Sequence, residues 1–259
     1  MRIIFPIQGN TDPPLHKYRE GVICVYYKKR IVSYLVFYCF LFAVLIAMTY
    51  LGDRTVTVLS QSGVSEDRHC IIIDAGHGGE DGGAISCTGI RESDINLEIA
   101  IKLQDLFHLL GYDTKMIRIT DKSVYTQGDT IAAKKVSDLK ERVRIINETE
   151  NALVISIHQN NFSDSRYSGA QIFYNSKEDS AALARQMQSN FVQTLNPGSN
   201  RKTKKSQGVY LMEHIQCTAV LVECGFLSNP QEEAKLRSKG YQKSICCVIA
   251  CSVSNYLDG

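Results

Sequence analysis

The sequence has no internal repeats, no low-complexity tracts and little net charge. Its formal charge of +2 arises in the first 51 residues, which hold six basic and two acidic side chains, whereas the rest holds 23 and 25. No extended basic stripe is present, and this argues against a nucleic-acid-binding protein. With 259 residues, of which 44% are hydrophobic, the chain has room for one sizeable globular domain and an appendage.

After residue 52, positive charge is dense only in residues 201–205, which contain Arg201, Lys202, Lys204 and Lys205. We interpret this run as a solvated loop, with contact to an acidic substrate as the alternative.

The nine cysteines do not predict a disulfide framework, because the seven that follow residue 52 are an odd number. Cys246, Cys247 and Cys251 recur at helical spacing in an apolar segment. Cysteine in such a setting commonly acts as a small buried hydrophobic residue, so we expect these three to be buried.

Residues 31–51 contain no charged side chain, and as a helix these 21 residues span about 30 Å, the thickness of a bilayer core. This predicts a transmembrane anchor. Lys28, Lys29 and Arg30 precede it, so residues 1–30 are expected to be a cytoplasmic tail and the remainder extracytoplasmic. A cleaved signal peptide is the alternative, but Ala47-Met48-Thr49 is a poor cleavage site. Residues 52–68 are then a linker and 69–259 the catalytic domain.

Residues 69–259 are expected to form a single α/β domain with a mixed, mostly parallel sheet of about six strands flanked by helices. Strands are predicted at 70–74, 113–119, 152–157, 169–174, 208–212 and 218–222. Helices are predicted at 92–110, 137–148, 177–195, 231–238 and 241–256. The first three strands and the sixth are expected to point the same way, and the fourth and fifth the opposite way.

Polar residues follow three of the strands that point the same way: His77, His158 and Glu223. Glu92 lies in the first turn of the helix that returns from the same edge, which is where open α/β sheets place their sites. Catalytic zinc needs three nitrogen or oxygen ligands and a nearby carboxylate that removes a proton from water. We therefore predict Zn²⁺ bound by His77, Glu92 and His158, with Glu223 as the general base.

Each assignment has an alternative. Glu92 would also complement a helix dipole, and a lone histidine such as His158 is more often a hydrogen-bonded packing residue. Asp74 is predicted to orient His77. A thiol mechanism is a second enzymatic hypothesis, in which Cys224 is the nucleophile and His158 its base.

Four ordered motifs resemble those of the zinc-dependent N-acetylmuramoyl-L-alanine amidases: residues 74–79, 89–92 with Asn96 and Leu97, 156–160, and 222–229. The resemblance covers about residues 70–257 and implies the same ligands and the same catalytic glutamate. It also implies hydrolysis of the amide between the lactyl group of N-acetylmuramic acid and the L-alanine of peptidoglycan stem peptides. The chain departs from the family in having Gln159-Asn160-Asn161 after the histidine, where we expect an effect on substrate contacts and not on metal binding.

Residues 166–174 are most similar to the spore-cortex branch of this family. That branch acts on the way to muramic δ-lactam, a cortex modification required for germination, and would work between the forespore membranes. We expect an activating or recruiting protein as a partner, besides the peptidoglycan substrate and the membrane. A catalytically inactive module that binds peptidoglycan is the alternative from another functional class.

Overall fold

The computed structural model describes residues 34–44, 46–47 and 69–258. The chain divides into two compact units, with the boundary between residues 65 and 66. The predicted tail and linker lie outside the described residues. Within the predicted anchor, residues 34–44 and 46–47 are helical, and most of their side chains are exposed. Among the described residues, no helix has both the length and the apolar character needed to cross a membrane.

The second unit contains a six-stranded sheet in the order β2-β1-β3-β6-β4-β5, which confirms the predicted mixed sheet. Its strands are β1 (Cys70–Ala75), β2 (Asp113–Met116), β3 (Ala152–Asn160), β4 (Gln171–Tyr174), β5 (Lys204–Lys205) and β6 (Thr218–Phe226). The pairs β1–β2, β1–β3 and β3–β6 are parallel, and β4 is antiparallel to β6, as predicted. The carboxyl ends of β1, β3 and β6 therefore meet at one edge of the sheet.

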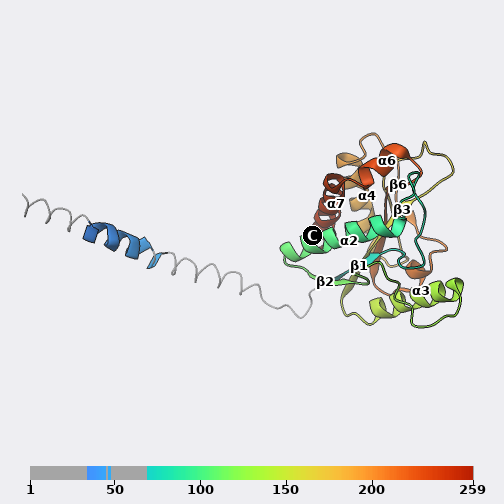
Figure 1. The fold of residues 1–259 in the computed structure, drawn as a ribbon, viewed down its shortest axis with the longest axis horizontal. Coiled ribbons are helices and arrows are strands. Elements are labelled where there is room, and N and C mark those ends of the chain that lie inside the picture. The colour runs from blue at the N-terminus through green and yellow to red at the C-terminus, as the bar shows by residue number, and fades with distance from the viewer. Residues whose placement is uncertain (1–33, 45, 48–68, 259) are drawn as a thin grey trace, which may run out of the picture. The chain divides into compact units, whose positions relative to one another are not determined.

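Helices cover both faces of the sheet (Figure 1). One face packs against α2 (Glu92–Leu109), α4 (Ser180–Thr194), α6 (Pro230–Leu236) and α7 (Lys239–Asp258), and the other against α3 (Ile131–Asn147) and α5 (Tyr210–His214). Ile71 and Ile73 belong to the first core and Ile72 to the second, and all three are fully buried. Burial on both faces explains the run of β-branched residues in β1.

The predicted strand at 208–212 is wrong. Residues 210–214 form the short helix α5, and the edge strand is β5, which pairs in parallel with β4. The side chain of Glu213 accepts a hydrogen bond from the backbone N–H of Gly208 (2.6 Å) and closes the first helical turn. Leu211 and Met212 are both buried although they are adjacent, and a short apolar run of this kind does not distinguish strand from helix.

Other boundaries differ as well. The helix α3 begins at Ile131 and not at residue 137, because the Thr130 side chain caps it by accepting a hydrogen bond from the Ala133 N–H (3.1 Å). The strand β2 is three residues shorter than predicted, and β3 and β6 extend beyond the predicted ends to Asn160 and Phe226.

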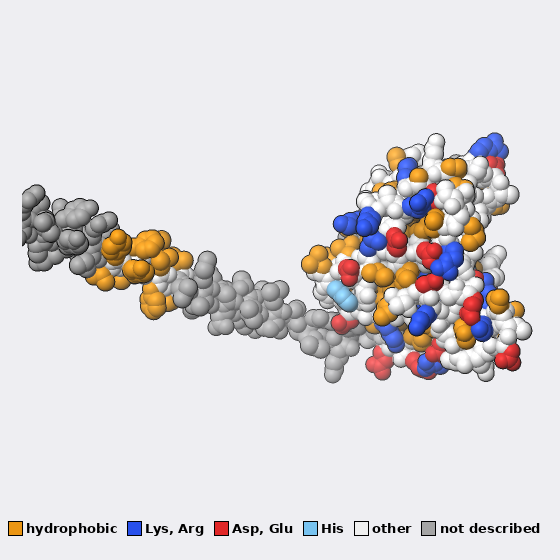
Figure 2. Space-filling model, in the orientation of Figure 1, with side chains coloured by type: hydrophobic (Ala, Val, Ile, Leu, Met, Phe, Trp, Pro, Cys, Tyr) orange, Lys and Arg blue, Asp and Glu red, His pale blue; other side chains and the backbone are white. Residues whose placement is uncertain are grey.

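Among the described residues every cysteine is free. Cys246 is buried as expected, but Cys247 and Cys251 are exposed on α7, so their predicted burial is wrong. Figure 2 shows acidic and basic side chains interspersed over the visible face of the second unit.

A buried arginine joins the second face of the sheet to α3. Arg142 forms ion pairs with Asp74 of β1 and, at 2.7 Å, with Asp138 of its own helix. Its side chain is only 2% exposed, and it also donates hydrogen bonds to the carbonyls of Ala75 (3.0 Å) and His77 (2.8 Å). These bonds compensate the desolvation that burial of the three charges imposes.

Replacing Arg142 by alanine should lower the free energy of unfolding by about 3–5 kcal/mol, because Asp74 would remain buried without its cation. Arg144→Ala is the matched control: the side chain is on the same helix but is 53% exposed, and it pairs with the partly exposed Glu141 and the exposed Glu148. We expect it to cost less than about 1 kcal/mol. Urea denaturation measures both, and equal losses would contradict the assigned role of Arg142.

Candidate active site

The loop after β1 is held by two buried arginines that point at its carbonyl groups. Arg118 donates to Ala75 O (2.8 Å) and Gly76 O (3.0 Å), while Arg142 donates to His77 O. His77 has a φ of 61°, a left-handed conformation that is unfavourable for a residue with a Cβ and that the loop contacts enforce. Neither arginine could be recognised from a motif; the only signal in the sequence is that Arg142 falls on the inward face of the predicted helix.

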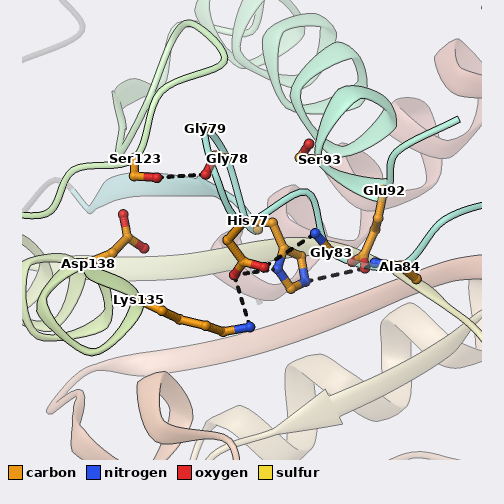
Figure 3. A network of polar contacts seen from close by, with 12 residues as sticks. His77, Gly78, Gly79, Gly83, Ala84, Glu92, Ser93, Ser123, Lys135 and Asp138 are labelled. Carbon is orange, nitrogen blue, oxygen red and sulfur yellow. Dashed lines mark hydrogen bonds and ion pairs between the residues drawn. The ribbon is translucent and has the colours of Figure 1, made fainter. Parts of the chain in front are cut away.

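Glu92 lies between the two histidines, and its carboxylate reaches both of them. Its Oε2 is 3.3 Å from His77 Nε2, and its Oε1 is 3.0 Å from His158 Nδ1. Figure 3 shows the side chains of His77 and Glu92 turned toward each other. One potential ligand atom from each of the three residues lies within 4.8 Å of the others, so the structure brings together the predicted ligand set.

The orientation of His77 comes from Asp81 and not from Asp74, which corrects the sequence-based prediction. His77 Nδ1 is 2.9 Å from Asp81 Oδ2, and Lys135 pairs with the same oxygen at 3.1 Å. Asp74 instead pairs with Arg142 and accepts a hydrogen bond from Ser156 (2.6 Å). A carboxylate on one ring nitrogen leaves the other directed at a metal, as is usual for histidine ligands. The sequence held one signal for this contact, because Asp81 is an acidic residue four positions after His77.

The charges in this cluster are strongly coupled. Burial acts to raise the pKa of Glu92, but the hydrogen bonds with His158 and His77 outweigh it and hold the pKa well below its usual range. Burial acts to lower the pKa of His77, but Glu92 and Asp81 outweigh it and raise the pKa. An ionised carboxylate between two imidazoles is a donor set that suits a divalent cation such as zinc.

Two glycines leave the space that these side chains occupy. A Cβ on Gly76 would lie 2.2 Å from His158 Nε2, and a Cβ on Gly83 would lie 2.6 Å from Glu92 Oε2. Only glycine therefore fits at either position without displacing a candidate ligand.

Glu223 is adjacent to this cluster because it pairs in register with His158 across the parallel strands β3 and β6. The register becomes irregular immediately after this pair, as is common beside active sites. Its Oε2 atom is buried without a hydrogen-bond partner among the described residues. Burial raises the pKa of Glu223 to about 7; the charge of His158 acts to lower this pKa, and the charge of Glu92 acts to raise it further. A carboxyl group with such a pKa can accept and release a proton near neutral pH.

Gln159 supports the ligand set from behind, a role that the expectation about substrate contacts did not include; for Asn160 and Asn161 that expectation stays a prediction. Its side chain is buried and donates to Asn96 Oδ1 (3.1 Å), and its backbone N–H donates to Glu92 Oε1 (3.1 Å). Asn96 Nδ2 in turn donates to Glu92 Oε1 (3.2 Å). These bonds fix the carboxylate of Glu92.

The geometry speaks against the thiol mechanism. Cys224 is 1% exposed and belongs to the core on the α2 face, whereas its neighbour Glu223 points to the opposite face with His158. Burial raises the pKa of the Cys224 thiol well above its usual value, so the thiolate nucleophile does not form readily.

Gly76→Ala should weaken zinc binding by roughly 10- to 100-fold, the range seen when the orientation of a ligand is disturbed. The added Cβ would displace the His158 ring. Gly240→Ala is the control, because a Cβ there meets no atom within 4 Å. Competition with a chromophoric chelator measures the affinities, and circular dichroism checks that both variants are folded. Equal affinities would show that His158 is not a ligand.

The pKa of Glu223 predicts a pH-dependent stability for the metal-free protein. Because this pKa is about 7 in the folded state against 4.5 unfolded, the folded protein keeps a proton that the unfolded chain releases between these values. Stability should therefore fall as pH rises through this window, by about 3 kcal/mol in total.

Glu223→Gln removes this titration. The free energy of unfolding of the variant minus that of the unsubstituted protein should therefore rise by about 3 kcal/mol between pH 4.5 and pH 8. Urea denaturation in the presence of a chelator measures the difference. Glu150→Gln, at an exposed position, should show no such trend. A stability difference for Glu223→Gln that does not change with pH would contradict the raised pKa.

Known proteins are similar to this chain in sequence and in fold. The profile of the Amidase_3 family, N-acetylmuramoyl-L-alanine amidase, matches residues 71–255. The germination-specific N-acetylmuramoyl-L-alanine amidase of Bacillus subtilis (strain 168) is 35% identical over 188 residues, which cover 72% of this chain and 78% of that protein. The CwlD amidase of Clostridioides difficile, solved in complex with the GerS lipoprotein, is 36% identical with a TM-score of 0.71, covering 74% of this chain and 99% of that one. An N-acetylmuramoyl-L-alanine amidase from Clostridium difficile 630 is 28% identical with a TM-score of 0.65, covering 74% and 98%. The chain therefore belongs to the N-acetylmuramoyl-L-alanine amidase family of enzymes.

Proposed function

We propose that this protein is a zinc-dependent hydrolase that cleaves the amide between the lactyl group of N-acetylmuramic acid and the L-alanine of peptidoglycan stem peptides. The observation that carries the proposal is the position of Glu223, a buried carboxyl group with an unpartnered oxygen beside the cluster of His77, Glu92 and His158. Membership of the amidase family supports the same reaction.

The residues present fit a zinc ion. Two imidazole nitrogens and one carboxylate oxygen converge, and Asp81 on the far side of His77 leaves the Nε2 atom of that ring for the metal. When bound, zinc supplies a Lewis acid that lowers the pKa of water and polarises the amide carbonyl.

The chain itself would move the proton. Glu223 accepts a proton from the attacking water at its unpartnered Oε2 and returns it to the nitrogen of the departing L-alanine. With a cation held by the three ligands, Glu223 would have a pKa below the value of about 7 that burial imposes, and its carboxylate form would prevail at neutral pH.

The relatives support a finer proposal about the biological role. One is described as germination-specific, and another was solved with a lipoprotein. We extend both features to this chain: it would act on spore-cortex peptidoglycan, in association with a protein partner. Amide cleavage frees the lactyl carboxyl group, which is needed before a muramic δ-lactam can form. The exposed apolar side chains at residues 34–44 support a membrane anchor that would place the catalytic unit outside the cytoplasm.

Mass spectrometry of peptidoglycan incubated with the purified protein tests the reaction. The unsubstituted protein should release stem peptides that begin with L-alanine, a chelator should abolish the release, and added zinc should restore it. Glu223→Gln should keep its zinc but lose activity by about 10²- to 10⁴-fold, the contribution of a general base. Cys224→Ala should remain active, because the thiol is buried and points away from the site.

Three results would contradict the proposal. Activity that survives chelation would exclude the metal mechanism, and full activity of Glu223→Gln would exclude the assigned base. Tight binding of peptidoglycan without any cleavage by the zinc-loaded protein would favour an inactive binding module.

A further inference from the structure

A basic hollow of about 990 Å³ lies beside β4. Its lining includes five basic side chains: Arg166, Arg201, Lys202, Lys204 and Lys235. The acidic residue of the lining, Glu232, is buried, and its two oxygens accept hydrogen bonds from the N–H groups of Gly169 (2.8 Å) and Phe226 (2.9 Å). The hollow therefore presents mainly positive charge to whatever enters it.

Gln171 connects this hollow to the catalytic strand. It lines the hollow and pairs in register with Glu223 across the antiparallel strands β4 and β6, so the two side chains lie on the same face, with Cβ atoms about 5 Å apart. Its Oε1 accepts a hydrogen bond from Arg201 Nη1 (2.9 Å), and its Nε2 donates to Lys202 O (2.8 Å). The basic residues thus begin one strand away from the proposed catalytic base.

Arg201 is held by hydrogen bonds and an aromatic contact and forms no ion pair among the described residues. Its Nε donates to Ser168 O (2.7 Å), and its guanidinium lies 4.5 Å from the centre of the Phe226 ring. Within the same part of the chain, three of its five N–H groups have no acceptor. Partial burial lowers its pKa, although the nearby carboxylate of Glu232, to which it has no hydrogen bond, acts to raise it. A fixed guanidinium with free N–H groups suits bidentate binding of a carboxylate.

We propose that Arg201 binds a free carboxylate of the stem peptide and so makes the enzyme selective for acidic peptides. The inference rests on the proposed amidase function, which places the amide to be cleaved at Glu223. Two or three extended residues span about 7 to 10 Å, enough to reach from that amide into the hollow. The sequence-based interpretation of residues 201–205 as a solvated loop holds only in part. Lys202, Lys204 and Lys205 are exposed, but Arg201 is half-buried.

A matched pair of substrates tests this selectivity. The first is a disaccharide-tripeptide whose peptide carboxyl groups are free, and the second is the same compound with those groups converted to carboxamides. The zinc-loaded protein should cleave the free acid with a kcat/KM at least about tenfold higher, since a charged hydrogen-bonded pair is lost in the amide. In Arg201→Gln the KM for the free acid should rise about tenfold or more with little change in kcat, and the preference should disappear.

Arg166→Gln is the control, because this residue lines the same hollow but its side chain is 89% exposed and already pairs with Asp164. It should retain the preference, and Arg201→Lys should retain part of it. Equal cleavage of both substrates by the unsubstituted protein would overturn this inference while the amidase function stands. Cleavage of neither would refute the proposed function itself. An equal loss on both substrates in Arg201→Gln, with the preference kept, would show that Arg201 only holds the loop.

Discussion

The parallel register of β1, β3 and β6 is the constraint on which the rest of the structure depends. Asp74 is opposite Ser156, and His158 is opposite Glu223, so side chains from three strands align on one face at one edge. A slip of one residue would turn each strand's side chains to the opposite face and bury polar groups in the core. Because the strands are buried on both faces, apolar packing excludes such a slip and thereby fixes the candidate site.

Two buried acidic residues on this face differ in their hydrogen-bond partners and in the direction in which their pKa values are shifted. Asp74 has a cation and a hydroxyl group as partners, so its burial is compensated and its pKa is lowered despite desolvation. Glu223 has an oxygen without a partner, and its pKa is raised. The first arrangement supports the loop that carries His77. The second is unfavourable for stability but leaves a carboxyl group able to exchange a proton, which is the usual relation between stability and function at an active site.

The same face of the sheet carries the proposed catalytic base and, one strand away, a residue that contacts the proposed peptide-binding arginine. β6 provides the proposed base, and its neighbour β4 provides Gln171, which holds the loop that carries Arg201. The cluster of His77, Glu92 and His158 lies on the other side of Glu223, toward β1. The proposed base therefore lies between the candidate metal site and the basic hollow. This order suits a substrate whose amide is cleaved at one point and whose peptide extends away from it.

Much of the fold and the core of the candidate site could be predicted from the sequence. The sequence contains apolar runs that are followed by polar residues at 77, 158 and 223 and are separated by amphipathic helices. These runs predict parallel strands whose carboxyl ends share one edge of the sheet, because right-handed crossovers allow few other arrangements. The helix α5 was missed because an apolar run of five residues fits either element.

Other features depend on side chains that are distant in the sequence and were decided only by the tertiary structure. Arg118 and Arg142 reach the loop carbonyls from separate segments, Asp81 takes the role expected of Asp74, and Arg201 forms no ion pair within the described part of the chain. The spacing of residues in the sequence predicts at which end or on which face of a strand or helix a residue lies. The partner of a buried charge is set by packing between elements, since desolvation makes any accessible donor or acceptor a candidate and only the folded geometry selects one.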